Sequence, residues 1–102
     1  MQTSMELRTK TNVRVLTYRE TEYLTFVALG CKNKRIGLIL SVSNNTVKKT
    51  LENIFQKIFA KDRANAITIA FTYGILTPQI IDDIKNKFIQ QIITLKDERF
   101  NI

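Results

Sequence analysis

Residues 16–63 read LTYRETEYLTFVALGCKNKRIGLILSVSNNTVKKTLENIFQKIFAKDR, and this stretch decides the fold. Its apolar residues recur at helical spacing in three successive segments, so it predicts three short amphipathic helices in a row. The third segment opens with a capping residue and carries lysines on the face that its apolar residues leave free. The polar side of that third helix is therefore the first place to look for a function.

Length and composition indicate one small helical domain with an uneven charge. The chain has 102 residues, 44% of them hydrophobic, with only three Gly and one Pro, which favours an all-α fold. Its net charge is +7, of which residues 16–63 hold +5, residues 1–15 hold +2 and residues 64–102 hold none. A basic excess concentrated in one segment predicts a polyanionic partner there.

Other functional classes are disfavoured by what the sequence lacks. It has no histidine and one cysteine, Cys31, so neither an intramolecular disulfide, a Cys–His pair nor a His/Cys metal cluster can form. We predict no catalytic residue, metal or cofactor, and interpret Cys31 as a small buried hydrophobe in preference to a redox sensor. No apolar run reaches the roughly 18 residues of a membrane span, and no secretory signal opens the chain. We expect a cytoplasmic, nucleoid-associated protein.

The first two helices have clear boundaries. Thr17 and Glu20 match a capping box, which predicts a helix from there to about Leu29, just before Gly30. The second helix is expected at 34–40.

Asn33 is the expected N-cap of that second helix, and Ile36 and Leu40 are its expected core positions. Gly37 lies between them, where a small residue suits the tight turn of a helix-turn-helix.

The third helix is expected at 44–59, capped by Ser43 after a short connection at 41–43. Its predicted buried stripe is Val47, Leu51, Ile54 and Ile58. Its opposite face carries Asn45, Lys49, Glu52 and Gln56, flanked by Lys48 and Asn53. These side chains are able to contact base edges or phosphates, although any solvated helix face is polar too.

Two more helices follow. A fourth is expected at about 63–73, capped by Asp62, with its apolar side formed by Ala64, Ile67, Ala70 and Phe71. Thr77 and Pro78 open a fifth, whose apolar seam is Ile81, Ile84, Phe88, Ile92 and Leu95. This fifth helix must bury that seam against its own domain or against a partner.

In order and spacing, these segments resemble the LuxR-type (GerE-like) helix-turn-helix family of bacterial transcription regulators. The family pattern appears as LTYRETEYLTFVALG at 16–30, NKRIGLIL at 33–40, SNNTVKKTLENIFQKI at 43–58 and RANA at 63–66. The resemblance implies a four-helix DNA-binding domain whose third helix enters the major groove and whose fourth helix commonly makes a twofold dimer. With no receiver or ligand-sensing segment, the chain resembles a stand-alone member.

On this basis we divide the chain into a flexible basic arm at 1–15, a helix-turn-helix domain at 16–74 and an amphipathic helix at 75–102. The predicted base-reading residues are Asn45, Lys48, Lys49, Glu52 and Asn53. The predicted phosphate contacts are Asn33, Lys34, Arg35, Thr46, Lys57 and Arg63. The dimer candidates are Ile67 and Phe71 in the fourth helix and Ile81, Ile84, Phe88, Ile92 and Leu95 in the fifth. We expect the fifth helix to add to the fourth or to cover it.

The chain departs from the family pattern at a few positions. Arg35 replaces an acidic residue and Thr50 a histidine, while Glu52 places a carboxylate on the outward face, where it suits cytosine N4. Leu38 and Ile39 replace residues that are usually polar. They either pack under the C-terminal helix, which we favour, or form a partner surface.

Two functions remain open. The first is sequence-specific binding of double-stranded DNA by a homodimer that regulates transcription. The alternative is a protein-interaction module on the same fold, which antagonises or partners another regulator or RNA polymerase. A steep dependence of binding on salt would distinguish the first from the second.

Overall fold

The computed structural model of the chain describes residues 16–97, and this part is all helical, as predicted. The helices are α2 Tyr18–Ala28, α3 Asn33–Leu40, α4 Asn44–Lys57, α5 Arg63–Thr72, α6 Pro78–Lys87 and α7 Ile89–Asp97. The predicted arm, residues 1–15, lies outside the described range. Within that range, none of the helices has both the length and the apolar character needed to span a bilayer.

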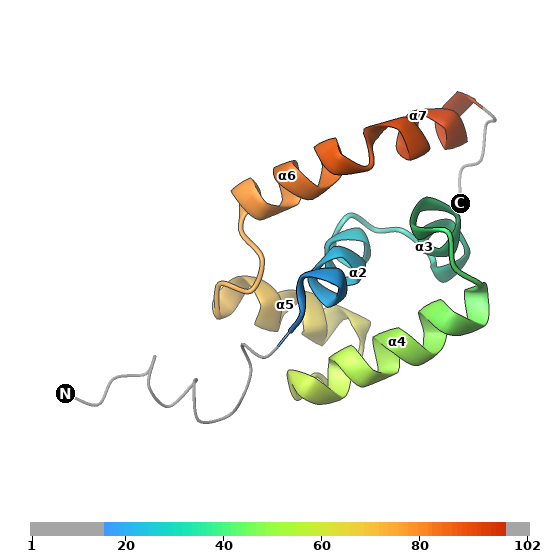
Figure 1. Cartoon of the computed structure of the whole chain (residues 1–102). Helices are drawn as coiled ribbons and strands as arrows, with labels where there is room; N and C mark the ends of the chain where they lie inside the picture. The colour runs from blue at the N-terminus through green and yellow to red at the C-terminus, as the bar shows by residue number, and fades with distance from the viewer. Residues whose placement is uncertain (1–15, 98–102) are drawn as a thin grey trace.

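The central element is α2, which contacts α3, α4, α5 and α6 (Figure 1). Its capping box is confirmed: the Thr17 hydroxyl accepts from the Glu20 N–H at 3.0 Å, and the Glu20 carboxylate accepts from the Thr17 N–H at 2.9 Å. Because α2 is surrounded, Leu24 and Phe26 are almost fully buried and join the core of the other helices.

The turn between α3 and α4 depends on Gly37, as expected. A Cβ at this position would lie 2.7 Å from the Val42 carbonyl oxygen, well inside van der Waals contact. The Val42 N–H donates to the Gly37 carbonyl at 2.9 Å, and Ser41 adopts a left-handed conformation with φ 61°. Only glycine leaves the space that this turn needs, so the close connection between α3 and α4 depends on the residue at position 37.

The start of α3 differs from the prediction by one residue. Asn33 is the first helical residue and Lys32 is the N-cap residue, without a capping side-chain bond. The Asn33 side chain is instead engaged with α5, where its Oδ1 accepts from Arg63 Nη1 at 3.0 Å. A tertiary contact has therefore replaced the local cap.

On α4 the predicted stripe is confirmed, since Val47, Leu51, Ile54 and Ile58 are all buried. The helix ends at Lys57, two residues earlier than expected, because Phe59 adopts a left-handed conformation with φ 60°.

The buried face of α5 differs from the prediction. Asp62 caps the helix, accepting from the Asn65 N–H at 2.8 Å. Ala66 and Ala70 are fully buried, whereas Ala64 and Phe71 are exposed and Ile67 is half-buried. Ala66 and Ala70, at i and i+4, thus form the buried face of α5, and Phe71 lies outside it.

The C-terminal segment forms two helices instead of one, because Phe88 interrupts the helix with φ −107° and ψ 20°. The two run in nearly the same direction across α2 and α3 (Figure 1). Within the chain, the segment thus packs mainly on α2 and α3 and does not cover the fourth helix, while its contribution to a dimer stays a prediction. The turn after α5, with Gly74 at φ 73°, carries the chain back over α2.

The seam of this segment is divided between core and surface. Ile84, Phe88 and Leu95 are buried in the chain's own core, and Phe88 meets Phe26 edge to face with ring centroids 5.8 Å apart. Ile81 and Ile92 are half-buried against that core.

Packing beneath the C-terminal segment is confirmed for Ile39, which is 1% exposed. Leu38 remains 45% exposed, so the partner-surface interpretation stays open for it alone.

Candidate nucleic-acid interface

The outer face of α4 is polar and open. It consists of the exposed side chains Asn45, Lys48, Lys49, Glu52 and Asn53, which are the predicted base-reading residues. The buried stripe on the opposite side of α4 holds this face away from the core. In Figure 1, α4 and the α6–α7 segment lie on opposite sides of α2, so the C-terminal helices do not cover it.

The lysines of this face keep their charges available. The ion pairs formed among the described residues use Arg19, Lys57 and Lys87 as cations, and neither Lys48 nor Lys49 takes part. A cation without an internal partner contributes its full attraction to an approaching polyanion.

The N-terminal ends of α3 and α4 meet in a polar hollow. A cavity of about 480 Å³ is lined by Asn33, Lys34, Asn44, Asn45 and Lys48. Helix N-termini carry unsatisfied N–H groups and partial positive charge, and two ammonium groups stand beside them here. The hollow thus joins predicted phosphate contacts to predicted base-reading residues in one electropositive surface.

The first turn of α4 is held by its own side chains. The Ser43 hydroxyl accepts from the Thr46 N–H at 3.0 Å and donates to Thr46 Oγ1 at 2.9 Å. Thr46 is exposed beside the hollow, so its hydroxyl is within reach of a partner while its backbone is fixed.

Arg63 is engaged inside the chain. Its Nη1 donates to Asn33 Oδ1 and its Nη2 donates to the Cys31 carbonyl oxygen. This clamp joins the start of α5 to the start of α3, and it orients Asn33 at the edge of the hollow. These bonds engage the guanidinium within the chain, and the phosphate contact of Arg63 stays a prediction.

Lys57 is paired as well. Its ammonium lies 2.8 Å from Glu20 Oε2 and joins the last turn of α4 to the first turn of α2. Burial would raise the pKa of Glu20, but the Lys57 ammonium and the Thr17 N–H together hold that pKa below its ordinary value. A phosphate contact by Lys57 would have to displace this carboxylate.

Arg35 lies apart from the hollow. It is half-buried and lines a second cavity with Cys31 and Lys85, so it faces the C-terminal helices. Burial raises the pKa of the Cys31 thiol, and Arg35 and Arg63 offset part of that effect. Cys31 itself is half-buried rather than fully buried, which partly corrects its interpretation as a core residue.

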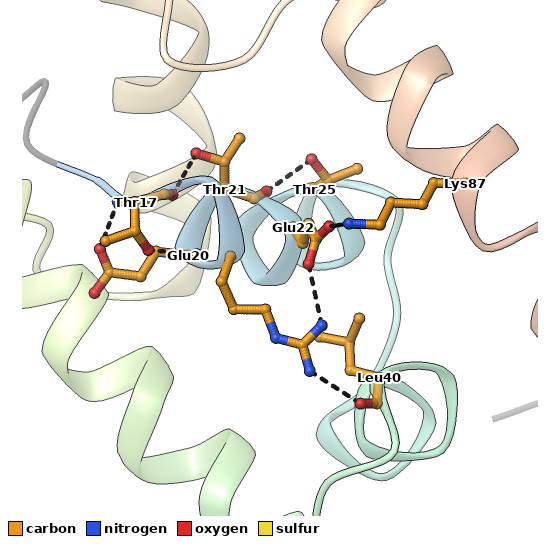
Figure 2. A network of polar contacts seen from close by, with 8 residues as sticks. Thr17, Glu20, Thr21, Glu22, Thr25, Leu40 and Lys87 are labelled. Atoms are coloured by element: carbon orange, nitrogen blue, oxygen red, sulfur yellow. Dashed lines mark hydrogen bonds and ion pairs between the residues drawn. The ribbon is translucent and has the colours of Figure 1, made fainter.

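A buried carboxylate was missed by the sequence interpretation. Glu22 is 1% exposed and pairs with Arg19 at 3.1 Å and with Lys87 of α6 (Figure 2). The second guanidinium nitrogen of Arg19 donates to the Leu40 carbonyl oxygen at 3.0 Å, at the end of α3. One buried charge therefore ties α2 to the helix-turn-helix turn and to the C-terminal segment.

The pairing of Glu22 with Arg19 could be predicted from the sequence, but its pairing with Lys87 could not. Glu22 lies four residues before the core residue Phe26 and three after Arg19, which places it on the buried side of α2 with a cation beside it. Lys87 is 65 positions away, and no local pattern connects it to Glu22.

Comparison with known proteins agrees with this architecture. The profile of the bacterial regulatory proteins of the luxR family matches residues 14–70. The chain is 41% identical over 71 residues to the transcriptional regulatory protein YdfI of Bacillus subtilis, covering 70% of this chain and 33% of that protein. It is 42% identical over 60 residues to the CsgBAC operon transcriptional regulatory protein of Escherichia coli, covering 59% and 28%.

The chain therefore spans about a third of the length of the curated relatives that it matches. No solved structure matches it significantly. Because the family profile covers more than half of the sequence and includes α2 to α4 and most of α5, the chain belongs to the luxR family of bacterial regulatory proteins.

Proposed function

We propose that the chain binds double-stranded DNA sequence-specifically, with α4 in the major groove, and so regulates transcription. The observation that carries this proposal is the set of exposed lysines Lys34, Lys48 and Lys49 on the outer face of α4 and around the hollow at the N-termini of α3 and α4. A helix of this kind presents its side chains to base edges while the neighbouring helix end contacts the backbone. Such a protein would act in the cytoplasm, on the nucleoid.

The roles on this surface divide by position. We assign base reading to Lys49, Glu52, Asn45, Asn53 and Lys48, all exposed on α4. Phosphate contact is assigned to Lys34, Asn33 and Thr46, which surround the helix N-termini. Lys57 would contact a phosphate only after releasing Glu20, and Arg35 only after turning away from the cavity that it lines near the C-terminal helices.

The proposal is tested by comparing the affinity of the chain for a specific duplex with its affinity for a scrambled duplex. A specific duplex is first selected from a random pool, and binding to it and to a scrambled duplex is measured by fluorescence anisotropy at several salt concentrations. Lys49→Ala is expected to lose about 1–3 kcal/mol on the selected duplex and less on the scrambled one. Lys61→Ala, which removes an exposed lysine of the α4–α5 loop, is the control. Equal losses on both duplexes would remove the base-reading role from Lys49.

We further propose that the chain dimerises through the outer face of α5. Ala64 and Phe71 are exposed there and Ile67 is half-buried, whereas Ile84, Phe88 and Leu95 are already occupied in the core. A twofold dimer of this kind would contact half-sites about 10 bp apart. Phe71→Glu is expected to shift sedimentation towards the monomer without unfolding the chain, because Phe71 is 44% exposed. An unchanged monomer–dimer equilibrium would reject α5 as the interface.

A protein-interaction module, with RNA polymerase or another regulator as its partner, is the second candidate. It is favoured by the exposed apolar side chains Leu38, Ile89 and Ile93, which lie on α3 and α7 rather than on α4. Affinity for DNA that hardly changes with salt would favour this second function over the first.

A further inference from the structure

A second cavity, about 300 Å³ in volume, lies between the α2–α3 region and the C-terminal helices. Its lining residues are Phe26, Leu29, Gly30, Cys31, Arg35, Ile39, Lys85 and Ile92. It shares none of them with the hollow at the N-termini of α3 and α4. It also depends on α6 and α7, which lie beyond the segment that matches the family profile.

The floor and the mouth of this cavity are apolar. Phe26 and Ile39 form buried walls at 1% exposure each, and Ile92 contributes from α7. Leu29 stands at the mouth with 42% of its surface exposed. Small-molecule sites are concave, mostly apolar and at least about 300 Å³ in volume, so the cavity has the size and lining of a site for a small ligand.

The polar groups of the cavity are cationic. Lys85 on α6 and Arg35 on α3 line it from two different helices, and the Cys31 thiol is the remaining polar side chain. No carboxylate of the described residues lines the cavity. The Lys85 ammonium takes part in none of the side-chain hydrogen bonds or ion pairs found among those residues, so it is available to an incoming anion.

We propose that this cavity is a binding site for a small amphipathic carboxylate, with the apolar chain against Phe26, Ile39 and Ile92 and the carboxylate at Lys85. An apolar body supplies the affinity and a fixed charge orients the ligand. Arg35 lines the same cavity from α3, and the Lys85 ammonium favours an anion over a neutral or cationic ligand.

Octanoate is a suitable probe, used below its micelle concentration with the full chain and followed by amide chemical shifts. Two matched probes separate the two parts of the proposal: 1-octanol keeps the chain without the charge, and butyrate keeps the charge with a shorter chain. We expect octanoate to shift the amides of residues 30–35 and of Ile92. Butyrate should bind at least about ten-fold more weakly because it buries four fewer methylenes.

Lys85→Gln should weaken octanoate binding by about five-fold and leave the fold intact, since Lys85 is exposed. Lys61→Gln, an exposed lysine outside the cavity, is the matched control and should bind octanoate as the parent does. The proposal is overturned if octanoate shifts no amide of the cavity, if octanol binds equally well, or if Lys85→Gln binds octanoate unchanged. Because the experiment contains no DNA, its outcome is independent of the proposed function.

Discussion

The helix α4 and the α6–α7 segment are both amphipathic, yet the chain uses their polar sides differently. Both direct an apolar stripe into the same core: Val47 and Ile54 from α4, and Ile84 and Phe88 from the C-terminal segment. The polar side of α4 carries the exposed Lys48 and Lys49, of which Lys48 lines the hollow at two helix N-termini, whereas residues 64–102 have no net charge. Amphipathicity therefore identifies a helix that packs on the core. The charge of its outer face then indicates whether that face is suited to bind a polyanion.

The strongest test of this comparison concerns whether the C-terminal segment is part of the core. Phe88→Ala is expected to lower the free energy of unfolding by about 3–5 kcal/mol, because it removes a ring packed edge to face on Phe26. Ile89→Ala truncates the neighbouring side chain, which is exposed. It should change the free energy of unfolding by about 0.5 kcal/mol or less. Urea unfolding measures both. Equal small effects would show that the segment is attached loosely and only α2 to α5 form the core.

A smaller effect is expected at the buried carboxylate that joins the two regions. Lys87→Met removes one of the two cations paired with Glu22 while keeping an apolar stem, and should cost about 1–2 kcal/mol because Arg19 still pairs.

Lys85→Met, on the same helix but outside any ion pair of the described residues, is the control in the same urea experiment. In a double-mutant cycle, Glu22→Gln should restore part of the stability lost in Lys87→Met. Additive losses would mean that the two side chains are not energetically coupled.

The smallest effect is expected where α4 meets α2 through Lys57 and Glu20. The pKa of Glu20 lies below its ordinary value in the folded chain, so its ionisation stabilises the fold above the unfolded pKa. That contribution is lost as the pH falls through the lowered folded pKa. Lys57→Met should therefore reduce stability at neutral pH by at most about 1 kcal/mol and flatten the acid limb of the stability curve.

Thermal unfolding at a series of pH values measures this effect, with Lys61→Met as the comparison. An acid limb as steep in Lys57→Met as in the parent chain would assign the lowered pKa of Glu20 to the Thr17 contacts alone.

Much of the fold could be predicted because its signals are local. The capping box of Thr17 and Glu20, the caps Ser43 and Asp62, and the need for glycine at position 37 each involve residues a few positions apart. The buried and outward faces of α4 follow from its period alone. The positions of the predicted base-reading residues, all exposed, were therefore accessible from the sequence.

The roles of several charged residues were not accessible in this way. Arg63 and Lys57 belong to exposed-looking polar patterns, but their partners Asn33 and Glu20 lie 30 and 37 positions away. Whether a cation faces solvent or an internal acceptor depends on how the helices cross, and helical period carries no information about that.

By itself, then, the sequence determined the helices from α2 to α5, the turn at Gly37 and the cationic outward face of α4, because caps, glycine and period act over a few residues. Only the tertiary structure decided that Phe88 and Ile84 pack on α2 and not on a partner, and that Glu22 receives Lys87. The physical reason is that an apolar stripe is satisfied by any apolar surface, and a buried charge by any suitably placed counter-charge. Which apolar surface and which counter-charge are used depends on how all the helices pack together.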